Sequence, residues 1–257
     1  MKSNYFQKLV VLNKSRKIFK NWNICAKLYL NQVRDKFAIL ETRTNKKIKI
    51  RTSTTDFMAL ANVWLLEDYK IKKFEIHSND VIIDIGAHIG IFTIYASQFC
   101  NNGKIFCFEP IQENYKMLIE NININQIKNI YPNNLAVTKD TSTAKIFLND
   151  DESGHSMFIE NKSFVQVDSK SLFDVFADNR IEECNFLKLD CEGAEYEIIE
   201  SLPSDFFSKI DKTVIEYHMA DTKPELLEGL IKKLKQLSFT IHTRPLFSDI
   251  GFLFARK

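Results

Sequence analysis

The chain has 257 residues, of which 45% are hydrophobic and 26% charged. This length suits one globular domain with a short additional segment, and 21 Phe and 8 Tyr supply apolar area for a core. Disordered, fibrous and low-complexity chains are excluded. Every apolar run is shorter than the ~18 residues that a membrane-spanning helix needs, and the basic start leads into too short an apolar stretch for a signal peptide. We expect a cytoplasmic protein, which could sit peripherally at a membrane.

The net charge of +2 hides an asymmetry between the two ends of the chain. Residues 1–51 carry a net charge of +12, and the remainder carries −10. Within residues 14–33, apolar side chains recur every three or four positions with basic ones between them, which predicts a basic amphipathic helix. Such a helix could pack on the main domain as a cap, or bind an anionic membrane surface or a phosphorylated carrier. The five Cys include no C-x-x-C pair, so we expect reduced thiols rather than disulfides or a zinc site.

The predicted elements begin with two short strands in residues 36–51 and a helix over 56–74. From residue 81 onward, strands alternate with helices. Further strands are predicted at 81–85, 104–109, 129–137, 144–148, 164–167, 185–190, 213–217, 239–243 and 251–255. Helices are predicted at 90–99, 110–122, 194–202 and 224–237. This order predicts an α/β fold, a mostly parallel sheet with helices on both faces, whose final strand is the antiparallel half of a hairpin. We place the domain boundary between residues 1–54 and 55–257.

Ligands in such sheets bind beyond the carboxyl ends of the strands. The first of these strands runs into Gly86 and Gly90, with His88 at the position where a dinucleotide-binding turn needs a glycine beside the pyrophosphate. S-adenosylmethionine contains no phosphate and needs only a tight turn beside its methionine part. Glu109 ends the next strand, where an acid can accept hydrogen bonds from both ribose hydroxyls. The glycine turn, followed by this acid at the end of the next strand, favours a nucleoside ligand.

The sequence resembles the FkbM family of S-adenosylmethionine-dependent methyltransferases over roughly residues 55–220. The residues that carry this resemblance are Val81 to Gly90, Gly103-Lys104, Phe108-Glu109-Pro110, Asn121-Ile122, Asn129-Ile130, Ala136-Val137, Ile215 to His218 and, most specifically, Leu187 to Glu195. The resemblance implies a Rossmann-like class I methyltransferase that acts on a hydroxyl of a small molecule, a polyketide or a sugar.

The same resemblance implies a cofactor site. Asp84, Gly86 and Gly90 would hold the methionine end of S-adenosylmethionine, Glu109 the ribose, and Asn134 would lie near the adenine. His88 belongs to this set but departs from the Asn expected there, which puts the fine shape of the methionine pocket in doubt and not the fold.

An alcohol must lose its proton as it attacks the methyl carbon, so an O-methyltransferase needs a base. We take Asp190, Glu192 and His218 as the candidate catalytic residues. Asp190 could equally be a metal ligand, a cofactor contact or a helix cap, and His218 a base oriented by Glu216 or a satisfied buried histidine. Glu195 could be a further base or could simply interact with a helix N-terminus. No metal is assigned, although Asp190, Glu192 and His218 offer ligand atoms.

Two residues outside these strand ends are weaker candidates. His155, in an acidic loop at 150–156, could contact the substrate or simply be solvated. Asp168 is expected to cap a helix that starts near residue 169.

The function expected from these observations is O-methylation of a sugar, a glycan or a small metabolite. The alternatives are a nucleotide-dependent oxidoreductase, disfavoured by His88, and a non-catalytic module that docks to a membrane or polymer. Nucleic-acid methylation is disfavoured because the main domain is acidic and has no Asn-Pro-Pro-Tyr-type motif.

Overall fold

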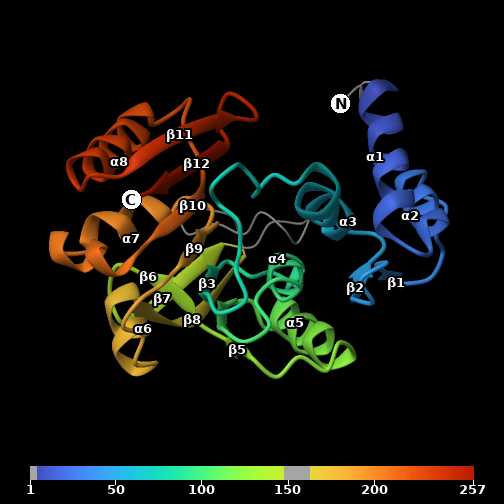
Figure 1. The fold of residues 1–257 in the computed structure, drawn as a ribbon, viewed down its shortest axis with the longest axis horizontal. Coiled ribbons are helices and arrows are strands. Elements are labelled where there is room, and N and C mark those ends of the chain that lie inside the picture. The colour runs from blue at the N-terminus through green and yellow to red at the C-terminus, as the bar shows by residue number, and fades with distance from the viewer. Residues whose placement is uncertain (1–4, 148–162) are drawn as a thin grey trace.

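The computed structural model describes residues 5–147 and 163–257 and is built around a seven-stranded sheet (Figure 1). The strands of this sheet are β3 (Val81–Ile85), β4 (Lys104–Phe108), β5 (Ile130–Asn133), β9 (Phe186–Leu189), β10 (Lys212–Tyr217), β11 (Thr240–Pro245) and β12 (Gly251–Arg256). Their order is β11-β12-β10-β9-β3-β4-β5. The pairs from β10 to β5 are parallel, and β12 runs antiparallel to both β10 and β11. The predicted parallel sheet with an antiparallel last strand is therefore confirmed.

The two faces of the sheet are covered by two separate hydrophobic clusters. Ile82 of β3 belongs to one cluster and its neighbour Ile83 to the other, because successive side chains of a strand point to opposite faces. Helices α4 (Ile91–Ala96) and α5 (Gln112–Ile124) pack in the first cluster. The second cluster takes α6 (Leu172–Asp178), α7 (Glu195–Ser201), α8 (Pro224–Gln236) and the 3₁₀ helix η2 (Ser204–Lys209). The fold has the three layers expected of an α/β domain.

A second sheet, of three strands, is formed by the part of the chain that follows β5. It contains β6 (Ala136–Thr138), β7 (Ser142–Phe147) and β8 (Phe164–Ser171) in the order β6-β8-β7. The single strand predicted at 129–137 is thus wrong: it divides into β5 and β6. Between the two strands, Asn134 donates hydrogen bonds to the carbonyl oxygens of Glu109 and Pro110 at 2.8 and 3.0 Å, away from either ladder.

The cap predicted at Asp168 is also wrong, because this residue is exposed within β8. Helix α6 is capped by Ser171, whose hydroxyl oxygen accepts a hydrogen bond from the Asp174 N–H at 3.0 Å. His155 and the whole acidic loop at 150–156 lie outside the described residues.

The N-terminal segment differs from the single helix predicted over 14–33. It forms α1 (Tyr5–Ile18) and α2 (Trp22–Tyr29), followed by a hairpin of β1 (Phe37–Glu41) and β2 (Lys47–Arg51). The break occurs because the backbone between the helices pairs with the hairpin. The Lys20 N–H donates to the Glu41 carbonyl at 2.7 Å, and the Arg43 N–H donates to the Ile18 carbonyl at 2.8 Å.

The helix predicted over 56–74 is shorter than expected. It consists of α3 (Asp56–Leu60), which continues as a π-helical turn, η1 (Ala61–Leu66). Glu67 ends it with a left-handed backbone (φ 59°), so the chain turns before Tyr69 instead of carrying it on the helix.

The N-terminal elements lie beside α3 and α5 (Figure 1) and share the first hydrophobic cluster with the rest of the chain. Phe19, Leu40 and Ile48 are fully buried there. The basic side chains of Arg16, Lys17 and others on α1 and α2 are exposed. The apolar side of these helices therefore packs as a cap, while the predicted contact with an anionic surface stays a prediction. Within the described parts of the chain, no helix is long and apolar enough to cross a membrane.

Candidate functional site

The glycine turn joins β3 to α4 at the carboxyl edge of the main sheet. Gly86 and Gly90 have left-handed backbones, with φ of 75° and 87°, and so does His88, with φ of 53°. The N–H groups of Gly86 and Ala87 donate to the Phe108 carbonyl at 3.1 and 3.0 Å. Three of the five residues from Gly86 to Gly90 therefore have left-handed backbones. The turn is tight enough to bring its N–H groups against the end of β4.

Glu109 fastens this turn from the other side. Its Oε2 accepts the His88 N–H at 2.8 Å, and its Oε1 accepts the Ile111 N–H at 2.9 Å. The carboxyl group is almost fully buried, and this burial raises its pKa to about 7 despite the two N–H donors. Asn134, predicted near an adenine, is exposed and instead braces the backbone beside Glu109.

Two cavities meet at this edge of the sheet. One, of about 170 Å³, is mostly apolar, and Phe108, Ile111 and Val137 line it beside Glu109. The other, of about 240 Å³, is more polar and is lined by Asn62, Tyr69, Lys188 and Glu216, among others. Both are lined by the same five residues, Ala59, Gly86, His88, Asp190 and Glu192. Together they reach the size of a small-molecule site, which is typically ~300–1,000 Å³.

Asp84 lies beneath the cavities and lines neither of them. It is fully buried, accepts a hydrogen bond from the Thr93 hydroxyl at 2.6 Å, and pairs with the Lys188 ammonium at 3.0 Å. Lys188 donates to the Gly86 carbonyl at 2.9 Å. Burial alone would lower the pKa of Lys188, but Asp84 and Asp190 raise it above its ordinary value. Asp84 thus supports the turn through Lys188 rather than facing a ligand.

Asp190 stands at the junction of the cavities, after β9. Its Oδ2 accepts a hydrogen bond from the Tyr69 hydroxyl at 3.0 Å and lies 3.6 Å from the Lys188 Nζ. The same hydroxyl lies 2.9 Å from Glu216 Oε2. Burial, followed by the charge of Asp190, raises the pKa of Glu216 to about 8. The sequence pattern does not predict that Tyr69 contacts Asp190, because the two residues are 121 positions apart in the chain. For the same reason it does not predict that the Tyr69 hydroxyl links Glu216 to Asp190.

His218 lies between two carboxylates. Its Nδ1 is 3.0 Å from Glu195 Oε1, and its Nε2 is 3.5 Å from Glu192 Oε2. Burial would lower the pKa of the imidazole, but these carboxylates raise it to about 10. Glu195 is fully buried and also accepts the Gly193 N–H at 2.9 Å, which agrees with its predicted place at the start of α7. The residue that orients His218 is therefore Glu195, and the expectation that Glu216 does so is wrong.

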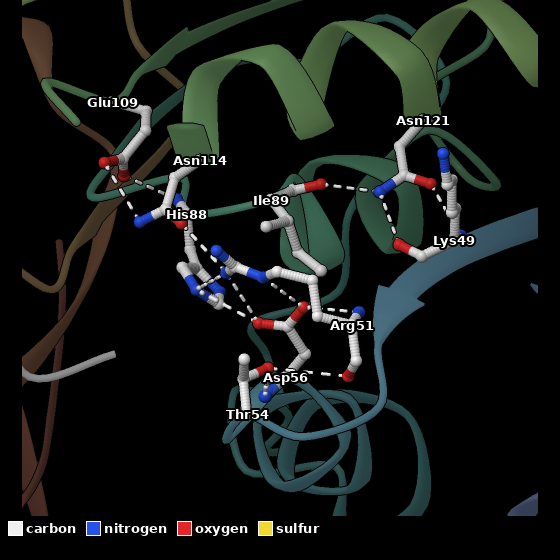
Figure 2. A network of polar contacts seen from close by, with 9 residues as sticks. All are labelled: Lys49, Arg51, Thr54, Asp56, His88, Ile89, Glu109, Asn114 and Asn121. Atoms are coloured by element: carbon white, nitrogen blue, oxygen red, sulfur yellow. Dashed lines mark hydrogen bonds and ion pairs between the residues drawn. The ribbon is translucent and has the colours of Figure 1, made fainter. Parts of the chain in front are cut away.

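A further part of the site comes from the N-terminal hairpin. Figure 2 shows Arg51, the last residue of β2, held by a bidentate pair with Asp56 (Nε to Oδ2 3.0 Å, Nη2 to Oδ1 2.8 Å). Its Nη2 also donates to Asn114 Oδ1 at 2.9 Å and lies 3.2 Å from His88 Nε2. Burial lowers the pKa of His88 to about 4, so the ring is neutral, and its Nε2 also lies 3.4 Å from Asp56 Oδ1.

Arg51 could not be predicted as part of the site from the sequence, because the signal is not local. Arg51 and His88 are 37 residues apart, and the predicted boundary at residue 54 separates them. In the same view, Asn121 clamps the main chain of Lys49, accepting its N–H at 2.7 Å and donating to its carbonyl at 3.0 Å (Figure 2). The hairpin is thereby fixed against α5.

The residues around the apolar cavity fit an adenosyl group without a phosphate. They offer apolar walls and one buried carboxylate at the rim, while His88 fills the place where a pyrophosphate would need glycine. The carboxylate can accept hydrogen bonds from ribose hydroxyls, as predicted for Glu109.

Comparison with known proteins agrees with this assignment. Residues 84–252 match the family model described as the methyltransferase FkbM domain. The chain is 25% identical to "Methyltransferase 1" of Beauveria bassiana, in a match that covers 55% of this chain and 65% of that protein. It is 24% identical to "Methyltransferase sdnD" of Sordaria araneosa, over 60% of this chain and 73% of that protein.

A solved structure shares the fold. The methyltransferase FkbM from Methylobacillus flagellatus superimposes with a TM-score of 0.52 at 15% identity. The match covers 78% of this chain and 53% of that one, so the chain spans about half the length of this structural relative.

Proposed function

Because the chain belongs to the FkbM methyltransferase family, we propose that it transfers a methyl group from S-adenosylmethionine to a hydroxyl oxygen of a sugar, a glycan or a small metabolite. S-adenosylmethionine, the methyl donor of this family, supplies a methyl group on a positively charged sulfur. The observation that carries the proposal is the junction of the two cavities at Asp190 and Glu192.

In this proposal the apolar cavity receives the adenosyl part of the cofactor. Glu109 accepts hydrogen bonds from the ribose hydroxyls, and the apolar walls pack against the base. Gly86 lets the methionine part pass close to the backbone at the end of β3. Lys188 and Asp84 keep this turn in place from below.

The more polar cavity receives the acceptor. An acceptor hydroxyl bound there would lie beside Asp190, whose carboxylate is partly exposed and oriented by the Tyr69 hydroxyl. We assign Asp190 as the group that takes the hydroxyl proton while the oxygen attacks the methyl carbon. Holding oxygen and methyl carbon at contact distance supplies much of the rate, and the base typically adds ~10²–10⁴-fold.

The test is methyl transfer from S-adenosylmethionine carrying a ¹³C-labelled methyl group. Acceptors are offered as matched pairs, each sugar or small metabolite beside its deoxy analogue that lacks one hydroxyl. The proposal expects labelled product only from the hydroxyl-bearing member, with the ¹³C signal of an O-methyl group. Label on nitrogen or carbon of the acceptor would contradict O-methylation while leaving the methyltransferase family intact.

The alternative as an oxidoreductase has no observation in its favour. A nicotinamide dinucleotide would bring its pyrophosphate against His88, which lines both cavities.

A further inference from the structure

Three metal-ligating side chains converge beside the second cavity, at the ends of β9 and β10. Asp190, Glu192 and His218 each offer one ligand atom, and all three atoms lie within 4.8 Å of one another. Two oxygen ligands of one divalent cation at about 2.0–2.4 Å can be at most about 4–5 Å apart. The three atoms can therefore share one ion after small side-chain rotations.

The group differs from a surface cluster of acids because buried partners orient its members. His218 is buried, and its Nδ1 faces the fully buried Glu195 at 3.0 Å, which leaves Nε2 directed toward Glu192. An imidazole whose second nitrogen donates to a carboxylate is the usual arrangement of a metal-bound histidine.

Asp190 is oriented in the same way. Its hydrogen bond with Tyr69 and its ion pair with Lys188 both involve Oδ2, and neither of these two contacts occupies the other oxygen, Oδ1. A ligating carboxylate is itself normally held by a hydrogen bond of this kind. Two of the three candidate ligands thus already have the supporting contacts that a metal site requires.

The charge balance of the region also favours a cation. Glu192, Glu195 and Glu216 join Asp190 here, whereas the nearby Lys188 is already paired with Asp84. These carboxylates would attract a divalent cation placed at Nε2 of His218, the nitrogen that lies 3.5 Å from Glu192 Oε2.

We propose that Asp190, Glu192 and His218 bind one divalent cation, with Glu195 and Tyr69 as the groups that position its ligands. Two carboxylates and one imidazole suit a divalent ion that accepts both oxygen and nitrogen ligands. Mn²⁺ is the ion that we would test first. Three protein ligands leave coordination positions for water and an acceptor oxygen.

The chemical role of this ion rests on the proposed function. An acceptor hydroxyl bound to the cation would lose its proton more easily, since a bound divalent ion lowers the pKa of a coordinated oxygen. The O–H bond would break with its proton passing to Asp190, the oxygen's electron pair would form the new bond to the methyl carbon, and the bond between that carbon and the sulfur would break, so that S-adenosylhomocysteine leaves with the electron pair.

The test uses the full chain without S-adenosylmethionine, because the positive sulfur of the cofactor would be attracted to the same carboxylates. Mn²⁺ is titrated by calorimetry and by loss of the free-ion electron paramagnetic resonance signal. We expect one saturable site per chain in the wild type. Glu192→Gln and Asp190→Asn should each weaken Mn²⁺ binding at least tenfold, because each removes a charged ligand from a partly exposed position.

Glu182→Gln is the matched control, because this glutamate is exposed in a loop away from the group and its removal should leave Mn²⁺ binding unchanged. The proposal is overturned if the folded wild type shows no saturable Mn²⁺ site, or if Glu192→Gln and Asp190→Asn both bind Mn²⁺ as the wild type does. A separate titration with S-adenosylmethionine distinguishes the two proposals: cofactor binding without an Mn²⁺ site would remove the cation and leave the methyltransferase.

Discussion

The carbonyl oxygen of Asp190 occupies the space into which a side chain at Gly86 would extend, since a Cβ at residue 86 would lie 1.7 Å from that oxygen. The left-handed backbone of Gly86 (φ 75°) adds a second reason for glycine. The turn that would hold the cofactor and the residue that would take the acceptor proton are thus in direct backbone contact. A side chain at residue 86 would therefore displace the backbone of Asp190.

Gly86→Ala should therefore destabilise the protein by roughly 2 kcal/mol or more and abolish cofactor binding. Gly229→Ala is the control, because a Cβ at this helical position meets nothing within 4 Å. It should stabilise α8 by about 0.5–1 kcal/mol. Thermal unfolding and calorimetric titration with S-adenosylmethionine measure both effects. Normal cofactor affinity in Gly86→Ala would contradict the placement of the methionine part at this turn.

The affinity for S-adenosylmethionine should fall as the pH drops below about 7. Burial raises the pKa of Glu109 to about 7, so the carboxylate that accepts from the ribose hydroxyls is lost by protonation on the acidic side of that value. Losing a charge-assisted hydrogen bond costs about 1.5–3 kcal/mol, or at least about tenfold in affinity. Titrations between pH 5.5 and 8.5 measure this, and Glu109→Gln should bind weakly with little pH dependence. An identical pH profile in the variant would assign the effect to another group.

Arg51→Lys should weaken cofactor binding although Arg51 belongs to the N-terminal hairpin. A lysine cannot reproduce the bidentate pair with Asp56 together with the contacts to Asn114 and His88. Because this change would displace His88, we expect the dissociation constant for S-adenosylmethionine to rise about tenfold. Arg43→Lys, on an exposed arginine outside this network, is the control and should bind normally. Equal affinities in the two variants would show that the hairpin does not position the site.

Asp190→Asn should keep cofactor affinity within about twofold and lower the rate of methyl transfer by about 10² or more. Tyr69→Phe should lower it less, because the ring still packs against Phe92 and Phe252 and the loss is confined to the hydroxyl contacts with Asp190 and Glu216. Single-turnover transfer separates this rate from binding. Wild-type rates in Asp190→Asn would remove this residue from the chemistry.

The parts of the fold that could be predicted are those with local signals. Alternating apolar strands, the glycines of the turn and the acid ending β4 identified the main sheet and its ligand-binding edge. The break between α1 and α2 could not be seen, because the helical spacing continues through it and only pairing with Arg43 and Glu41 interrupts the helix.

The functional residues also divide into those with a local signal in the sequence and those without one. Glu109 and Asp190 line the cavities where strand ends predict a ligand. Asp84 does not, because it pairs with Lys188, which is distant in sequence but directly beside it on the neighbouring strand β9, and this pairing makes Asp84 a buried support. The partnership of His218 with Glu195 depends on how α7 starts beside β10, which no spacing in the sequence reveals.

The most direct test of the proposed cofactor site is calorimetric titration of the full chain with S-adenosylmethionine and, separately, with S-adenosylhomocysteine, each repeated on Glu109→Ala. We expect one site per chain with micromolar affinity for both ligands, and a large loss of affinity in the variant while its thermal unfolding stays cooperative. A folded wild-type chain that binds neither ligand would contradict the proposed cofactor site.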